Sequence, residues 1–209
     1  MMKQRIKHPI GWMAISAFSM VIGISASITL STTDKWWRIA LSKLSVEPFG
    51  FIFSLTFILS SATLAVALHL QLRHMGRHWG GEKWRLIIFR WLLFGLCLGL
   101  GLIGIFPDKE PWLAPHRAGG WISILTATAI SLGVYVWLPP YPPLFKRFSL
   151  MIGALPYIGL AAFVTNRITF TMLELFLLFL GAVWMTVFYA YTRVFTGYAS
   201  VEILAEGGD

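Results

Sequence analysis

The amino-acid sequence predicts an all-α, polytopic integral membrane protein with six transmembrane helices in a compact bundle. Its 209 residues are 57% hydrophobic and only 12% charged. The mean hydropathy of +0.72 lies far above that of a soluble domain. Long apolar segments alternate with short polar connections, so residues 1–209 are expected to form a single transmembrane domain.

Six apolar segments are each close to the length, about 17 to 25 residues, that a helix needs to cross the hydrocarbon core of a bilayer. They cover residues 9–30, 48–70, 86–106, 121–137, 148–164 and 168–194. The first follows a basic start, as a secretory signal would, but its length favours a retained helix. The two shortest, the fourth and fifth, are joined by a proline-rich stretch with Lys146 and Arg147, which is typical of a surface turn.

The Lys and Arg residues are distributed unequally over the two ends of such a bundle. If both termini share one side, that side collects most of the 17 Lys and Arg residues. Because cytoplasmic loops retain basic residues, both termini are expected in the cytoplasm, with the chain in a bacterial inner membrane. The same excess explains the net charge of +8, so we infer no nucleic-acid partner.

Tryptophans accompanied by cations mark the expected membrane interfaces. On the outer side, Trp36 and Trp37 lie in an amphipathic stretch that is typical of a short interfacial helix or of a loop at headgroup level. On the inner side, the residues expected to meet anionic headgroups are Trp79, Trp84, Arg73 and Arg77. A zinc site at His74 and His78, four residues apart, is a weaker interpretation of the same stretch.

Small residues at regular spacing predict close helix contacts. The first helix has one such face and the third has two, formed by Ser19, Gly23 and Ser27, by Gly95 with Gly99, and by Gly101 with Gly104. The two faces of the third helix fall on roughly opposite sides, given about 100° per residue. The third helix is therefore expected to pack from two sides, in the interior of the bundle.

Titratable residues gather in the stretch FPDKEPWLAPHRAGGW, residues 106–121, which is expected as the outer connection between the third and fourth helices. Glu174 lies within the last predicted span, roughly 9 Å from its outer end at 1.5 Å per residue. A carboxylate at that depth costs a few kcal/mol unless it is paired, so a cationic partner is expected. The ligand or ion-pair candidates are Glu174, His116, Arg117, Asp108, Glu110 and Arg167.

Three interpretations of this polar cluster remain open. Carboxylates with a histidine could hold a metal ion that activates water, they could form a protonatable pair in a transporter, or they could fasten the outer loops as a salt-bridge network. The network is favoured, because no metal motif with defined spacing is present. The sequence also has no phosphate-binding loop, nucleophile elbow, HExxH motif or haem attachment site, so no catalytic residue, metal or cofactor is predicted.

Two stretches between Leu41 and Trp121, LSKLSVEPFGFIFSLTFILSSATLA and GLIGIFPDKEPWLAPHRAGGW, resemble segments of the damage-regulated autophagy modulator and Frag-type membrane proteins and their bacterial relatives. One departure is that Phe53 is followed by Ser54 where that superfamily often has Asn. The resemblance implies a six-helix bundle with both ends cytoplasmic. It also implies a regulatory or accessory role in lipid and membrane processes, with no shared catalytic mechanism.

The sequence therefore predicts a membrane accessory or lipid-binding protein without catalytic activity of its own, a role that suits a subunit of a larger membrane complex. Its expected partners are membrane lipids and other membrane proteins. One alternative is a small proton-coupled transporter using Glu174 and His116, which would need a water-accessible cavity reaching Glu174 from the outer face. The other is a metal-dependent membrane hydrolase, which would hold metal in stoichiometric amount.

Overall fold

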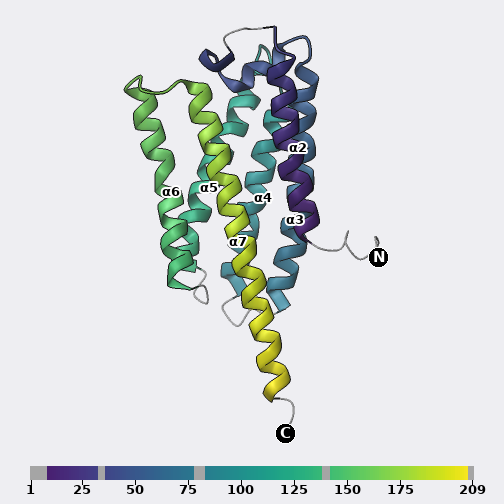
Figure 1. Cartoon of the computed structure of the whole chain (residues 1–209), viewed down its shortest axis with the longest axis vertical. Coiled ribbons are helices and arrows are strands. Elements are labelled where there is room, and N and C mark those ends of the chain that lie inside the picture. Colours follow the sequence, from purple (N-terminus) through teal and green to yellow (C-terminus); the bar gives the residue numbers. More distant parts are fainter. Residues whose placement is uncertain (1–8, 33–35, 78–82, 138–141, 207–209) are drawn as a thin grey trace.

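The computed structural model describes residues 9–32, 36–77, 83–137 and 142–206, and in these residues the only secondary structure is helical. The long helices are α2 (Pro9–Thr29), α3 (Gly50–Arg77), α4 (Lys83–Ile105), α5 (Leu113–Trp137), α6 (Pro143–Val164) and α7 (Phe170–Glu206). Two short 3-10 helices, η1 (Trp36–Arg38) and η2 (Leu41–Val46), lie across the end of the bundle at which α2 ends and α3 begins (Figure 1). We call this the η2 end.

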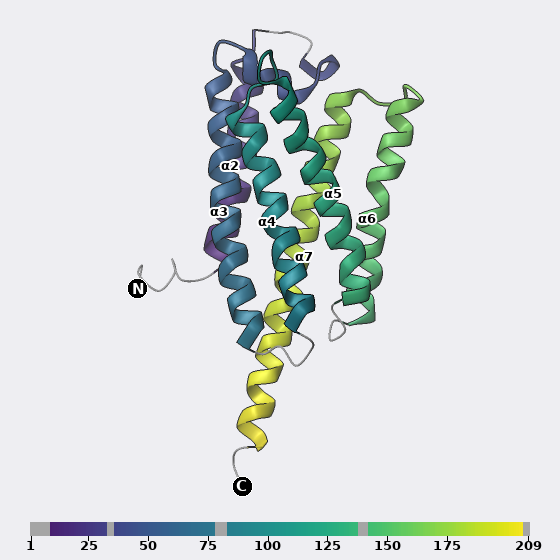
Figure 2. The same ribbon diagram turned by 180° about the vertical axis from the view of Figure 1, so that it is seen from behind.

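The chain has the helices of a multi-pass membrane protein. Five of the described helices, α2, α3, α4, α6 and α7, are long and apolar enough to cross a membrane. The remaining long helix, α5, has 25 residues and runs alongside them (Figure 2). The start of α2 and the end of α7 lie toward the same end of the bundle, which we call the open end, and α7 projects beyond it (Figure 1).

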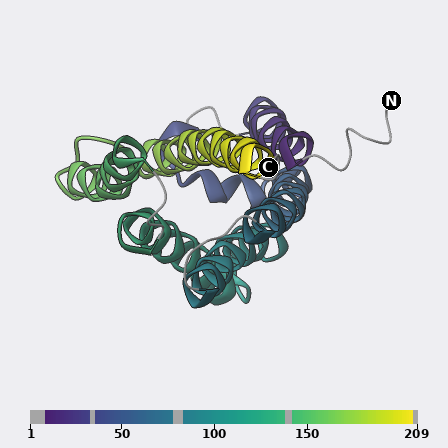
Figure 3. The ribbon, with the colours of Figure 1, turned by 90° about the horizontal axis from the view of Figure 1, so that it is seen from below.

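The long helices are arranged as an arc, with α7 across its ends (Figure 3). Seen from the open end, α2, α3, α4, α5 and α6 follow one another around an arc, and α7 lies between α6 and α2 (Figure 3). Helices that follow one another in the chain are therefore mostly neighbours in space, as short connections require. Helix α7 packs on α6, which precedes it in the chain, and in addition reaches α3.

Helices α2 and α3 pack closely through small polar residues. The Ser16 hydroxyl donates to the Ser60 carbonyl over 2.9 Å, and the Ser19 and Ser60 hydroxyls lie 2.8 Å apart. A Cβ atom on Gly23 would lie only 1.8 Å from Oγ1 of Thr56, so the helices meet where a side chain is absent. The small-residue face expected on the first helix is thus confirmed as its contact with α3.

Helix α4 is packed on both sides by close helix contacts. A Cβ atom on Gly99 would lie 2.7 Å from the carbonyl oxygen of Gly119 on α5, and one on Gly104 would lie 2.8 Å from the carbonyl oxygen of Ser54 on α3. Gly95 likewise faces Thr126 of α5. The expectation that the third helix has two opposite packing faces is confirmed.

An aromatic cluster joins α6 and α7 toward the open end. The rings of Trp184 and Phe188 stack with centroids 5.0 Å apart, and Phe145 of α6 is fully buried beside them. The indole N–H of Trp184 donates to the Ser149 hydroxyl over 2.7 Å, and Ser149 donates to the Ser131 carbonyl over 3.0 Å. This chain of hydrogen bonds links α7, α6 and α5 and satisfies their polar groups in an apolar setting.

The helices differ from the predicted spans chiefly at their ends. Helix α3 continues to Arg77, α7 continues to Glu206, and α5 begins at Leu113 instead of residue 121. The predictions followed apolar character, whereas a helix continues past the hydrocarbon core as long as its backbone hydrogen bonds are made. Pro115 does not prevent the earlier start of α5, because proline is tolerated in a first helical turn.

The interfacial helix expected around Trp36 and Trp37 is in fact the two short 3-10 helices η1 and η2. Trp36 is half-buried and Trp37 is exposed. Leu41 and Leu44 of η2 are almost fully buried in a cluster with Phe53 of α3. The segment is therefore anchored in the protein, because its leucines pack on α3.

Candidate functional site

The turn that leads from η2 into α3 needs a glycine. A Cβ atom on Gly50 would lie 2.2 Å from the carbonyl oxygen of Ser45, so any larger residue would collide with the backbone of η2. The N–H of Gly50 donates to the carbonyl of Glu47 over 2.8 Å. This tight turn places η2 directly above the start of α3, with its polar side chains toward the connection between α4 and α5.

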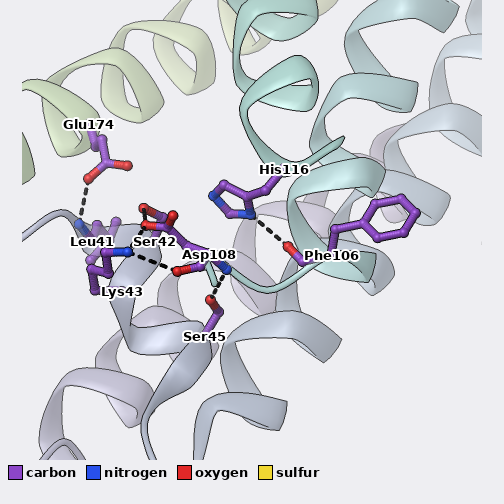
Figure 4. Close-up of polar contacts among 8 residues, drawn as sticks. All are labelled: Leu41, Ser42, Lys43, Ser45, Phe106, Asp108, His116 and Glu174. Atoms are coloured by element: carbon purple, nitrogen blue, oxygen red, sulfur yellow. Dashed lines mark hydrogen bonds and ion pairs between the residues drawn. The ribbon is translucent and has the colours of Figure 1, made fainter. Parts of the chain in front are cut away.

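Asp108, in that connection, is held by three residues of η2 (Figure 4). Its carboxylate accepts a hydrogen bond from the Ser42 hydroxyl over 3.0 Å and pairs with Nζ of Lys43 at 3.1 Å. Its backbone N–H donates to the Ser45 hydroxyl over 3.0 Å, and Lys43 also donates to its carbonyl over 2.8 Å. Asp108 is 7% exposed, so η2 replaces the water that would otherwise solvate it.

Glu174 reaches η2 from the first turns of α7. Its carboxylate accepts a hydrogen bond from the backbone N–H of Leu41, the first residue of η2 (Figure 4). The first N–H groups of a helix have no partner within the helix, and Ala40 before it has no side chain that could cap them. Glu174 therefore caps η2 from a distant helix.

His116 ties the start of α5 to the end of α4. It is 6% exposed, and its Nδ1–H donates to the carbonyl of Phe106 over 2.6 Å (Figure 4). Phe106 directly follows α4, where helix carbonyls lack partners within the helix. Because His116 serves this carbonyl and Arg117 is exposed, the expected pairing of Glu174 with either residue was wrong. Glu174 did need a partner, but a backbone N–H group supplies it.

The other predicted site residues lie on the surface. Glu110, Arg117 and Arg167 are exposed and are found in no ion pair within the described part of the chain. Of the residues expected at the inner interface, Arg73 and Trp84 are exposed, and the Arg85 guanidinium lies 5.4 Å from the centre of the Trp84 ring.

The remaining residues predicted at the inner interface lie outside what the structure describes. These residues are Trp79 and His78, and the side chains of Arg77 and His74. Elsewhere in the described chain, no group of three His, Cys, Asp or Glu side chains is placed to hold a metal ion.

A cavity of about 430 Å³ lies inside the bundle, between α2, α5, α6 and α7, with α3 and α4 at its back. Its lining is overwhelmingly apolar, with a few hydroxyls such as those of Ser16, Ser60 and Ser131. Two of these three hydroxyls donate to backbone carbonyls, Ser16 to Ser60 and Ser60 to Ser16. The interior therefore has little free hydrogen-bonding capacity for water.

The cavity and the polar cluster are separate features. On α7 the lining runs from Leu177 to Tyr189 and does not include Glu174; His116 is not part of it either. This cavity therefore does not lead to Glu174, as the cavity of a transporter using that residue would. The cluster acts as a fastening of η2, and the cavity is the candidate binding site.

Sequence reasoning missed this cavity. The signal that points to it is small residues on two helices that face each other, Ala14 and Ala17 of α2 and Gly181 and Ala182 of α7, all of which line it. The spacing of Ala14 and Ala17 was not recognised as a second small-residue face of α2. Comparisons with protein-family models, with curated proteins and with solved structures give no match for this chain.

Proposed function

We propose that this chain is a lipid-binding accessory protein of a bacterial plasma membrane that holds a lipid acyl chain inside its helical bundle. It spans the membrane six times with both termini in the cytoplasm, serves as a subunit of a larger membrane complex, and catalyses no reaction of its own. We also propose that the chain is related to the damage-regulated autophagy modulator and Frag-type membrane proteins, which its sequence resembles. The observation that carries it is the apolar cavity of about 430 Å³ between α2, α5, α6 and α7.

The chemistry of the lining selects an apolar occupant. An internal site holds ordered water only where it offers each water two to four polar partners, and this lining offers few. At the depth of the spanning helices, the abundant apolar molecules are lipid acyl chains. An acyl chain that fills the space would restore the dispersion contacts that the lining side chains otherwise lack.

The shape of the cavity also suits an acyl chain. Its lining on α7 extends from Leu177 to Tyr189, roughly 18 Å along a helix that rises 1.5 Å per residue. This is close to the depth of one leaflet, which is half of a hydrocarbon core about 30 Å thick. A linear chain aligned with the helices fits such a space better than a compact ligand does.

The length of α5 supports a sixth crossing. Its 25 residues extend about 37 Å at 1.5 Å per residue, which exceeds the hydrocarbon thickness of about 30 Å. With six crossings both termini lie on one side, and the excess of Lys and Arg on that side favours the cytoplasm.

The test is to fill the cavity and measure retained lipid. Gly181 lines the cavity, and a Cβ atom on it would meet no atom within 4 Å, so Gly181→Phe is the variant chosen to fill the cavity. Gly120 on α5 has the same clearance and does not line the cavity, which makes Gly120→Phe a matched control. We expect wild type and Gly120→Phe to retain phospholipid after extensive detergent washing, as seen by native mass spectrometry, and Gly181→Phe to retain several-fold less. Equal retention by all three proteins, or none by wild type, would contradict the proposal.

A further inference from the structure

Building on the acyl-chain proposal, we propose that the occupant is a phospholipid with an anionic headgroup, drawn from the leaflet at the open end of the bundle. Its acyl chain enters between α2 and α7, and its headgroup stays among basic residues at that end. Three independent observations lead to this: the depth of the cavity, the side on which it opens, and the imbalance of charge along the bundle.

The cavity extends from the middle of the bundle, where Leu96 and Leu100 of α4 line it, toward the open end. On α2 its lining begins at Ile10, the second residue of the helix, and ends at Met20. On α7 it reaches Tyr189, close to Thr192, where the apolar span ends. An acyl chain in this space therefore lies at the depth of one leaflet. Its headgroup comes to the interface at the open end.

The cavity opens between α2 and α7. The exposed lining residues of these helices include Ile10 and Ala17 on α2 and Gly181 and Ala182 on α7, and α2 and α7 are adjacent in the view along the bundle (Figure 3). Three of these four residues are alanine or glycine, so small side chains border the gap at these positions. A different face of α2, including Ser19 and Gly23, packs on α3, which leaves this face free to border the opening.

The described charges are unbalanced along the bundle, because carboxylates accompany the cations at the η2 end but not at the open end. The described side chains at the open end include the cations Arg73, Lys83, Arg90, Lys146 and Arg147. The carboxylates whose side chains are described lie at the η2 end: Glu47, Asp108, Glu110 and Glu174. Clustered cations at a membrane surface attract anionic lipids, so the open end favours an anionic headgroup.

The cations of α6 lie in its first turns, before the part of the helix that lines the cavity. Lys146 is half-buried and Arg147 is exposed, and α6 begins to line the cavity at Ile152 and Gly153. Lys146 and Gly153 are seven residues apart and therefore share a helix face. A headgroup above an acyl chain that packs on Gly153 would thus lie within reach of Lys146.

The experiment uses the full chain in bilayers that contain phosphatidylglycerol and phosphatidylcholine with identical acyl chains. After detergent extraction, native mass spectrometry gives the ratio of the two lipids that stay bound. We expect phosphatidylglycerol to be enriched over its share of the bilayer, by roughly fivefold for each contributing cation. The double variant Lys146→Gln with Arg147→Gln should lose most of this enrichment. The matched double variant Lys109→Gln with Arg117→Gln, at the η2 end, should keep it.

Each outcome separates this inference from the proposed function. Retained phospholipid in the same ratio as the bilayer, or a retained fatty acid without a headgroup, overturns the anionic-lipid inference and leaves the acyl-chain site intact. Absence of any retained lipid overturns both. The ratio of the two lipids retained by wild type tests the anionic-lipid inference even if the double variant fails to fold.

Discussion

The carboxylate of Glu174 on α7 accepts a hydrogen bond from the backbone N–H of Leu41, 133 residues earlier in the chain. The Thr171 hydroxyl, one turn before Glu174, donates to the carbonyl of Trp36 in η1 over 3.3 Å. These two bonds fasten the first connection of the chain to its last helix. The bundle is thereby covered at the η2 end, whereas the cavity borders the gap between α2 and α7 nearer the open end.

Removing the Glu174 cap should destabilise the protein. In Glu174→Ala the N–H groups at the start of η2 lose their acceptor, so we expect the free energy of unfolding to fall by about 1 to 2 kcal/mol. Glu174→Gln keeps an amide oxygen that can accept the bond from Leu41 and should recover much of that loss. Unfolding in mild detergent and hydrogen exchange at the Leu41 amide measure both effects. Glu110→Ala, at an exposed carboxylate, is the control, and an equal effect of Glu110→Ala and Glu174→Ala would refute the capping role.

Asp108 should matter more than the lysine that pairs with it. Asp108→Ala removes the acceptor for the Ser42 hydroxyl as well as for Lys43, and we expect a loss of about 1 to 3 kcal/mol. Lys43→Met removes one partner whose side chain is 44% exposed, and such ion pairs contribute less than about 1 kcal/mol. Chemical unfolding of the single and double variants gives the comparison. A larger loss in Lys43→Met than in Asp108→Ala would show that the ion pair, not the hydroxyl contact, holds η2.

The close contact between α4 and α5 should not tolerate even one methyl group. Gly99→Ala brings a Cβ atom against the backbone of Gly119, and overpacking of this kind costs about 1 to 3 kcal/mol. Gly120→Ala, where a Cβ atom meets nothing within 4 Å, should be neutral or stabilise the helix by about 0.5 to 1 kcal/mol. Thermal unfolding of the two variants provides the readout. The packing described for α4 would be wrong if both variants unfolded at the wild-type temperature.

Membrane orientation can be read from the accessibility of single cysteines. The chain has one cysteine, Cys97, which is buried in α4, so Cys97→Ala provides a background without thiols. In that background, Lys109→Cys at the η2 end should react with a membrane-impermeant maleimide added to intact cells. Arg147→Cys at the open end should react only after the cells are lysed. The reverse pattern would place the termini outside the cytoplasm.

Helix positions were largely predictable, because hydropathy is a local property of the chain. The first and third predicted spans, 9–30 and 86–106, lie close to α2 (Pro9–Thr29) and α4 (Lys83–Ile105). The start of α5 was missed because Pro115, His116 and Arg117 suggested a loop. These residues begin a helix instead, since polar side chains at a helix end can remain outside the hydrocarbon core.

The partner of Glu174 was not predictable from the sequence. Its depth showed that it needs a partner, but every residue except proline has a backbone N–H, so nothing marks Leu41 as the donor. One indirect signal exists, because Ala40 cannot cap the helix that follows it. The cavity was equally hidden, since it depends on how the small residues of α2 and α7 are placed across from each other in three dimensions.

The most direct test of the acyl-chain site is photocrosslinking with a phospholipid that carries a diazirine near the end of its acyl chain. Neighbouring residues provide matched positions. Leu178 and Ile124 line the cavity, and Ile124 is 38% exposed, whereas Phe179 and Leu125 do not line it and are 64% exposed. After washing removes exchangeable lipid and the sample is irradiated, we expect mass spectrometry to place crosslinks at Leu178 and Ile124. Crosslinks confined to Phe179 and Leu125 would contradict an acyl chain inside the bundle.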